Sequence, residues 1–151
     1  MRILIDGDAC PVMNLAIEIA KCNQIEVVIF CDTAHYMERS DVKVVIVSKG
    51  SDAVDFKLVN ELQKGDILIT QDYGLAAMGL AKKGYPIHQN GFRYTDKNMD
   101  QLLFTRHLGK EVRRQGGRTK GPSKRGKEQD EAFRNGLVQL IHELNERESF
   151  A

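Results

Sequence analysis

The sequence predicts an α/β fold with a mostly parallel central sheet. Short apolar runs alternate along the chain with stretches whose apolar residues recur at helical spacing. This alternation is typical of parallel strands joined by right-handed helical crossovers. The first run, 3–5, stops abruptly before two carboxylates, and Pro11 then opens a predicted helix. Apolar runs that end at helix starts are typical of buried parallel strands, so we expect a sheet of four to five strands.

Each element follows from its own pattern of apolar residues. The expected strands are 3–5, 27–30, 42–47, 67–70 and, as a short edge strand that tolerates proline, 86–88. The expected helices are 11–22, 51–62, 73–83, 98–114 and 128–147. The apolar stripes of the last two helices are expected to pack against the sheet or against each other.

Length and composition place the chain among single-domain proteins. Its 151 residues, 42% of them hydrophobic, are enough for one domain over 1–151 with its own core. No apolar run is long enough to span a membrane, and the N-terminus lacks the pattern of a signal peptide. We therefore expect a cytoplasmic protein without a membrane partner, either a monomer or a homo-oligomer.

Cysteine and histidine carry little functional signal in this sequence. The three cysteines are odd in number and lack the spacing of a disulfide framework or a zinc site. Cys10 precedes a helix start, where a thiol can become acidic, but the sequence favours a small semi-buried structural residue near a tight turn. The histidines show no ligand spacing and are left out of the expected site: His35, His88, His107 and His142.

A basic segment near the C-terminus is the strongest charge asymmetry. The stretch 113–127 holds seven basic residues and no acid, in a chain whose net charge is +1. Its four glycines and Pro122 predict a flexible loop rather than a helix, followed by the C-terminal helix. Such a loop fits contact with a phosphate backbone, and it fits a solvated linker equally well.

Five aspartates follow the predicted strands where helices begin. Asp6 and Asp8 follow the first strand, Asp52 and Asp55 follow the third, and Asp72 follows the fourth. The carboxyl ends of parallel strands lie at one edge of the sheet, where ligands bind in such folds. Each aspartate alone is explained as a helix N-cap. Together they predict a cluster of negative charge.

A divalent cation would resolve the repulsion within such a cluster. Two carboxylates about 4 Å apart repel by roughly 4 kcal/mol at an effective dielectric constant near 20. Carboxylate oxygens suit Mg²⁺ or Mn²⁺, which also meet substrate phosphates, whereas zinc prefers histidine and cysteine. A metal held by acids near a basic loop points to hydrolysis of phosphodiester bonds by activated water.

An ordered set of motifs resembles the YaiI/YqxD-type family of bacterial proteins. These motifs span nearly the whole chain, at 6–11 (Asp-x-Asp-Ala-Cys-Pro), 50–55 (Gly-x-Asp-Ala-x-Asp), 65–76, 91–98 and 121–122 (Gly-Pro). The resemblance implies a PIN-like domain, a three-layer α/β/α sandwich whose better-known members are Mg²⁺- or Mn²⁺-dependent ribonucleases. The chain departs from the family pattern after the Gly-Pro motif, where Lys124-Arg125 and later Asp130-Glu131 occur.

The expected function is therefore that of a metal-dependent nuclease acting on RNA, the choice of RNA resting on the resemblance alone. The expected catalytic residues are Asp6, Asp8 and Asp72, and the expected metal ligands are Asp6, Asp52, Asp55 and Asp72. Basic residues are expected to contact the nucleic acid backbone: Arg93, Arg106, Arg113, Arg114, Arg118 and Lys120.

Two alternatives stay open at this point. Strand-Asp6-Gly7-Asp8 also resembles the opening of haloacid-dehalogenase-type phosphatases, in which the first aspartate is the nucleophile. Those enzymes place a second acidic motif after a later strand, whereas here Gly65-Asp66 precedes its strand. The other alternative is a non-catalytic module that binds RNA or a protein through the basic loop.

Overall fold

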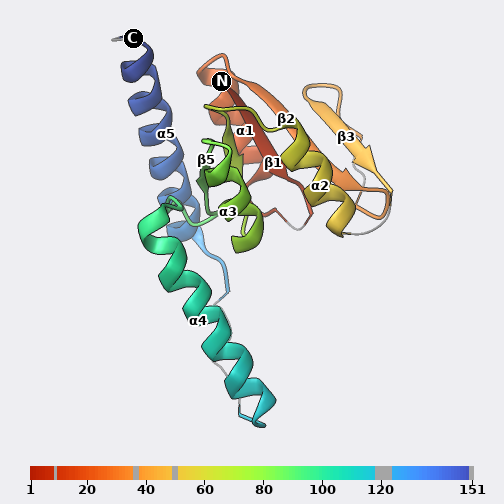
Figure 1. Ribbon diagram of the computed structural model, residues 1–151. Coiled ribbons are helices and arrows are strands. Elements are labelled where there is room, and N and C mark those ends of the chain that lie inside the picture. The colour runs from red at the N-terminus through yellow and green to blue at the C-terminus, as the bar shows by residue number, and fades with distance from the viewer. Residues whose placement is uncertain (9, 36–37, 49–50, 118–123, 150–151) are drawn as a thin grey trace.

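The computed structural model describes residues 1–8, 10–35, 38–48, 51–117 and 124–149 (Figure 1). Within them, five strands form one parallel sheet with the order β3-β2-β1-β4-β5. The strands are β1 (Arg2–Asp6), β2 (Glu26–Asp32), β3 (Lys43–Val47), β4 (Ile67–Ile69) and β5 (Tyr85–Ile87). This confirms the predicted α/β fold and its parallel sheet of four to five strands.

Five described helices connect and cover the strands, at nearly the positions that the sequence predicts. They are α1 (Met13–Cys22), α2 (Ser51–Glu61), α3 (Tyr73–Ala81), α4 (Asp96–Arg114) and α5 (Lys127–Ser149). The prediction started α1 at Pro11, two residues early, because Pro11 and Val12 form a turn ahead of the helix.

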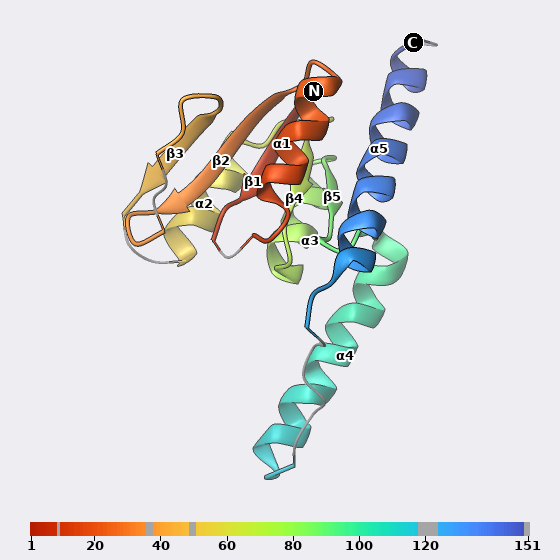
Figure 2. The ribbon, with the colours of Figure 1, turned by 180° about the vertical axis from the view of Figure 1, so that it is seen from behind.

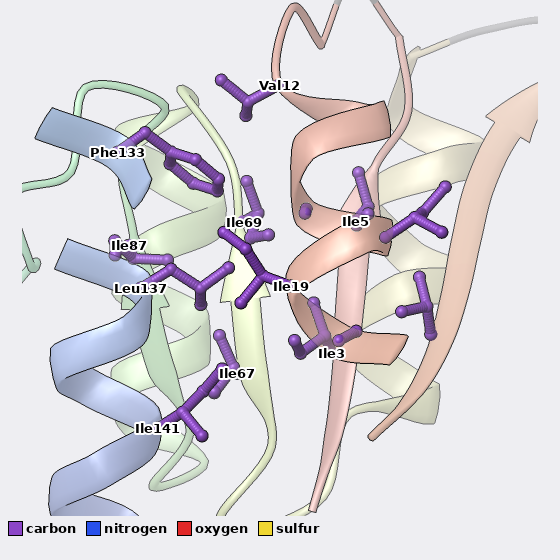
Figure 3. Close-up of a cluster of buried hydrophobic side chains, with 14 of the residues drawn as sticks. Ile3, Ile5, Val12, Ile19, Ile67, Ile69, Ile87, Phe133, Leu137 and Ile141 are labelled. Atoms are coloured by element: carbon purple, nitrogen blue, oxygen red, sulfur yellow. The ribbon is translucent and has the colours of Figure 1, made fainter. Parts of the chain in front are cut away.

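The helices cover both faces of the sheet and so make three layers. Alternate side chains of each strand point to opposite faces. On one face, Ile3 and Ile5 of β1 belong to a core cluster with α1 and α5, which also includes Phe133 and Leu137 of α5 (Figure 3). On the other face, Leu4 lies in a second cluster with residues of α2 and α3. Seen from behind, α1 lies in front of the sheet with α5 beside it (Figure 2).

Helix α4 begins against the body of the protein and then leaves it. Its first turn is fixed by a capping box, in which Thr95 and Asn98 exchange side-chain and backbone hydrogen bonds. Met99 is buried against α3, but the C-terminal half of the helix extends away from the sheet (Figures 1 and 2). We expected the apolar stripe of this helix to pack against the sheet or another helix. This is wrong beyond Leu102, because the apolar residues of the extension are exposed: Leu103, Phe104, Leu108 and Val112.

The strand order creates one position where the chain changes direction across the sheet. From β1 the chain moves outward through β2 to β3, and then returns to place β4 on the other side of β1. Ligands of open parallel sheets bind outside the carboxyl ends of the strands at such a switch point. The carboxyl ends of β1 and β4 are Asp6 and Ile69, and Thr70 and Asp72 follow directly.

The described ends of the basic segment are helical, in a turn or without regular secondary structure, and its centre lies outside the described residues. Helix α4 runs to Arg114 and α5 starts at Lys127, while 118–123 is not described. None of the helices in the described part of the chain combines the length and the apolar character needed to cross a membrane.

Candidate functional site

Asp6 ends β1 in an environment that disfavours its negative charge. Burial raises the pKa of its carboxyl to about 6, and a hydrogen bond from the Thr70 hydroxyl opposes this rise. The negative charges of Asp55, Asp8 and Asp72 raise the pKa further. These groups come from different junctions of the sheet and lie near enough to Asp6 for their charges to act on its carboxyl.

Asp55 faces the same cluster from the first turns of α2. Its pKa is raised to about 6 by partial burial and then by the charges of Asp72, Asp52 and Asp8. Asp52 lies one turn earlier on the same helix and is exposed. Because the two residues are three positions apart, they lie on the same face of α2. We call Asp6, Asp52, Asp55 and Asp72 the carboxylate cluster.

Asp72 is both a helix cap and a member of this cluster. Its Oδ1 accepts hydrogen bonds from the backbone N–H groups of Gly74 at 2.8 Å and Leu75 at 3.2 Å. Both bonds use the same oxygen, so capping α3 occupies one side of the carboxylate. The cap interpretation and the ligand interpretation, which the sequence presents as alternatives, are thus compatible at this residue.

A hydroxyl that the sequence analysis did not select connects two of the acids. The Thr70 hydroxyl donates to Asp6 Oδ2 at 3.0 Å and accepts from the backbone N–H of Asp72 at 3.0 Å. The buried Tyr94 hydroxyl in turn donates to the Thr70 carbonyl at 3.0 Å. A threonine between the last strand residue and an aspartate is the sequence signal that could have pointed to this positioning role.

The glycine between the first two acids allows the chain to lie against β2. The Gly7 N–H donates to the Phe30 carbonyl at 2.8 Å. A Cβ at this position would lie only 2.8 Å from both that oxygen and Cγ2 of Ile29. Glycine is therefore required by the close approach. Asp8 consequently leaves the loop on the β2 side, while Asp6 bonds to Thr70 on the β4 side.

A small pocket lies against the acids. Its volume of about 10 Å³ is enough for one water-sized group. Burial raises the pKa of the Cys10 thiol in its wall to about 11, so this thiol is protonated at neutral pH. The structural interpretation of Cys10 is favoured over a nucleophilic one. The pocket is lined by Asp6, Asp8, Cys10, Ile69, Thr70, Gln71 and Gln89.

The predicted nucleic-acid residues have different surroundings. Arg93 forms an ion pair with Glu143 of α5 at 2.7 Å, so its guanidinium already links the β5–α4 loop to α5. Arg113 and Arg114 are exposed at the end of α4, where Arg114 lies 3.2 Å from Glu111. The side chain of Arg106, together with Arg118 and Lys120, falls outside the described residues.

Arg125 is a cation near the pocket that the sequence analysis did not select. It donates to the Gln89 carbonyl at 2.8 Å and to Asn90 Oδ1 at 2.7 Å, and it pairs with Asp130 at 2.8 Å. Its charge lowers the pKa of Cys10, so it lies close to the pocket wall. The sequence did not indicate this position for Arg125, because the residue stands in a basic run that departs from the family pattern.

Comparison with known proteins settles the family. The model of DUF188, described as "Uncharacterized BCR, YaiI/YqxD family", matches residues 4–143. The chain belongs to the YaiI/YqxD family. A UPF0178 protein of Exiguobacterium sibiricum is 49% identical over 143 residues, which cover 95% of this chain and 98% of that protein. One from Clostridium kluyveri is 51% identical over 141 residues, 93% of each chain.

The family relationship confirms the resemblance that the motifs indicated. A third relative, the UPF0178 protein of Ruminiclostridium cellulolyticum, is 50% identical over 141 residues, 93% of this chain and 92% of that protein. No solved structure gives a significant match to the chain.

Proposed function

We propose that this YaiI/YqxD protein is a PIN-like, metal-dependent nuclease that hydrolyses phosphodiester bonds in RNA in the cytoplasm. The observation that carries the proposal is the gathering of acids from three strand-to-helix junctions at the switch point of the sheet. Asp6 and Asp55 both have their pKa raised to about 6 by burial and by neighbouring carboxylates. A site that concentrates negative charge in this way favours a bound cation over an empty pocket.

The donor set fits Mg²⁺ or Mn²⁺. Asp6, Asp52, Asp55 and Asp72 offer hard carboxylate oxygens, and the capping bonds of Asp72 leave one side of its carboxylate for a ligand. A bound divalent cation would lower the pKa of a coordinated water and neutralise charge on the phosphate. Thr70 holds the orientation of Asp6 and Asp72, and Asp8 orients a water or binds the cation directly.

The basic residues supply the other half of the proposal. Arg113 and Arg114 are exposed on the extended end of α4, and Arg125 lies beside the pocket wall. Positive side chains at these positions fit contacts to an RNA backbone that passes over the carboxylate cluster. Arg106, Arg118 and Lys120 remain predicted contacts.

Cleavage of labelled RNA in Mg²⁺, in Mn²⁺ and in EDTA tests the proposal. Asp6→Asn and Asp72→Asn should each lower the cleavage rate by about 100-fold or more, because each removes a charged ligand. Asparagine still accepts the Thr70 hydroxyl and is a good N-cap, so both variants should fold. Binding of RNA, measured by fluorescence anisotropy, should stay near the wild-type value.

Asp41→Asn is the matched control, because Asp41 is an exposed acid paired with Lys21 and Arg39 outside the carboxylate cluster. Its cleavage rate should equal that of the wild type. Wild-type protein that binds RNA but cleaves none of a varied set, with either metal, would favour the binding module. An aspartyl-phosphate trapped on Asp6 would instead favour the phosphatase.

A further inference from the structure

Beside the carboxylate cluster, Asp8 meets two potential metal ligands that the proposed nuclease chemistry does not use, Asp32 and His35. Asp32 is the last residue of β2, two residues beyond Phe30, which pairs with Asp6 at the end of β1. This overhang brings Asp32 alongside Asp8. One oxygen of Asp32 accepts the backbone N–H groups of Ala34 at 3.0 Å and His35 at 2.9 Å. The resulting turn folds His35 back toward both carboxylates.

The distances among these side chains are close to those of a coordination shell, although the shorter of the two is at present a hydrogen bond between His35 and Asp32. His35 Nδ1 lies 2.7 Å from Asp32 Oδ1 and 3.4 Å from Asp8 Oδ1, and all three residues offer ligand atoms within 4.8 Å of one another. Ligand atoms bound about 2.1 Å from one ion at tetrahedral to octahedral angles are separated by about 3.0–3.4 Å. A shift of a few tenths of an ångström would therefore suffice to seat an ion between them.

The surroundings of Asp8 are a second observation. Its side chain is 23% exposed, but its Oδ1 is buried and accepts no hydrogen bond from the described residues, and its contact with His35 Nδ1 is an ion pair at 3.4 Å. A buried carboxylate oxygen without a hydrogen-bond donor is unfavourable. This oxygen points toward His35 and Asp32, so a cation between them would satisfy it.

The site is also accessible from outside. The His35 side chain is 52% exposed. A cavity of about 500 Å³ opens beside it and gives room for water ligands and an entry path. This cavity is lined by Gly7, Cys10, Pro11, Met13, Asn14, His35 and Arg39.

We propose that Asp8, Asp32 and His35 bind a divalent transition-metal ion at a second site next to the carboxylate cluster. An imidazole nitrogen suits Mn²⁺, Fe²⁺ or Zn²⁺, whereas Mg²⁺ and Ca²⁺ prefer oxygen alone. Asp8 lies between the two groups of ligands, because it lines the small pocket together with Asp6 and its Oδ1 lies 3.4 Å from His35 Nδ1. If the proposed function holds, on which this role rests, the ion is the second cation of a two-metal hydrolytic site.

The competing explanation is a simple ion pair, in which protonated His35 neutralises the two acids without any metal. The two explanations differ in one respect that can be measured directly, namely whether an imidazole nitrogen becomes bound to the added ion. We therefore choose Mn²⁺ as the probe and electron spin-echo envelope modulation as the readout, since this method detects nitrogen bound to the ion.

The experiment uses wild-type protein with ¹⁵N-labelled histidine, loaded with Mn²⁺ in the presence of excess Mg²⁺ to fill the all-carboxylate site. The expected spectrum has modulation from one ¹⁵N nucleus. His35→Gln should abolish this modulation and weaken binding of the Mn²⁺ ion by about tenfold or more. His107→Gln, which changes an exposed histidine on α4, is the matched control and should leave the spectrum unchanged.

A labelled wild-type spectrum without nitrogen modulation would overturn the inference, whatever the variants do. Modulation that survives His35→Gln would overturn it as well. If His35→Gln fails to fold, Asp32→Asn replaces it, with the same expected loss of affinity. The outcome is separable from the proposed function, because cleavage that depends on Asp6 and Asp72 can occur without nitrogen coordination, and coordination can occur in a protein that cleaves no RNA.

Discussion

Asp6 and Asp66 are two aspartates whose side chains are largely buried, at opposite edges of the same sheet, and their neighbours differ in sign. Asp66 precedes β4 at the amino edge and is only 3% exposed. It accepts the Arg2 guanidinium at 2.9 Å and the backbone N–H groups of Arg2 at 3.1 Å and Gln63 at 2.9 Å. Asp6 at the carboxyl edge receives one hydroxyl bond and faces three further carboxylates.

The difference separates a structural acid from a functional one. The charge of Asp66 is matched within the protein, so it links the start of β1 to the start of β4 without any ligand. Burial and three neighbouring carboxylates disfavour the negative charge of Asp6, so the ionised side chain destabilises the folded protein. Groups of charged residues that destabilise the fold are expected at functional sites. The comparison thus predicts opposite effects when each charge is removed.

The largest expected effect is at the amino edge. Asp66→Ala removes the acceptor of two backbone N–H groups and the carboxylate partner of the Arg2 guanidinium, which keeps its hydrogen bond to the Glu61 carbonyl. Breaking a buried pair in this way costs about 3 kcal/mol. Urea denaturation should therefore show a large fall in the free energy of unfolding. Asp41→Ala removes an exposed acid with two cationic partners, and should lower the free energy of unfolding far less, because solvent screens exposed ion pairs. Equal losses in the two variants would contradict this account of Asp66.

The expected change at the carboxyl edge is smaller and has the opposite sign. Asp6→Asn removes a charge whose pKa is raised from 3.8 to about 6. A shift of this size corresponds to at most about 3 kcal/mol, and the amide keeps part of the desolvation cost. The metal-free variant should be more stable than the wild type at neutral pH by about 1–2 kcal/mol. Added Mg²⁺, which prefers the all-carboxylate site, should stabilise the wild type more than the variant.

The pH dependence of the stability difference between Asp6→Asn and the wild type shows whether the charge of Asp6 causes it. Because the pKa of Asp6 is higher in the folded state, the folded protein binds more protons, and stability falls as pH rises from about 4 to about 6. The advantage of Asp6→Asn should grow across this range and level off above it. Urea denaturation of both proteins at a series of pH values measures it. An advantage that is constant with pH would exclude charge as the cause.

Much of this comparison was accessible from the sequence. The apolar runs predict the five strands, and the shared carboxyl edge of a parallel sheet predicts that Asp6, Asp55 and Asp72 converge. That argument needs only strand order along the chain, not side-chain geometry. The N-cap chemistry of Asp72 was also readable, because an aspartate directly before a helix start is a strong local signal.

What escaped prediction depends on register and on distances in space. The apolar run of β2 was expected to end at Phe30, but pairing with β3 carries the strand on to Asp32. Without those two residues, Asp32 and His35 cannot be placed beside Asp8. His35 was set aside because no other ligand type stands at regular spacing from it. The extension of α4 was missed for a related reason, since an apolar stripe does not specify what covers it.

The smallest expected effect concerns Thr70, which changes the pKa of Asp6 but not the number of charges at the site. Its hydroxyl donates to the ionised carboxylate and lowers the pKa of Asp6 against the effect of burial. Thr70→Val removes this donor, and a hydrogen bond worth about 0.5–1.5 kcal/mol corresponds to a rise of roughly half a pKa unit or more. Carbon-detected NMR titration of the metal-free protein measures the Asp6 carboxyl directly. Thr70→Ser keeps the hydroxyl and should restore the wild-type pKa. A valine variant with an unchanged Asp6 titration would show that β4 positions this carboxylate without the hydroxyl, and that the bond between the two strands is incidental to the charge at the edge of the sheet.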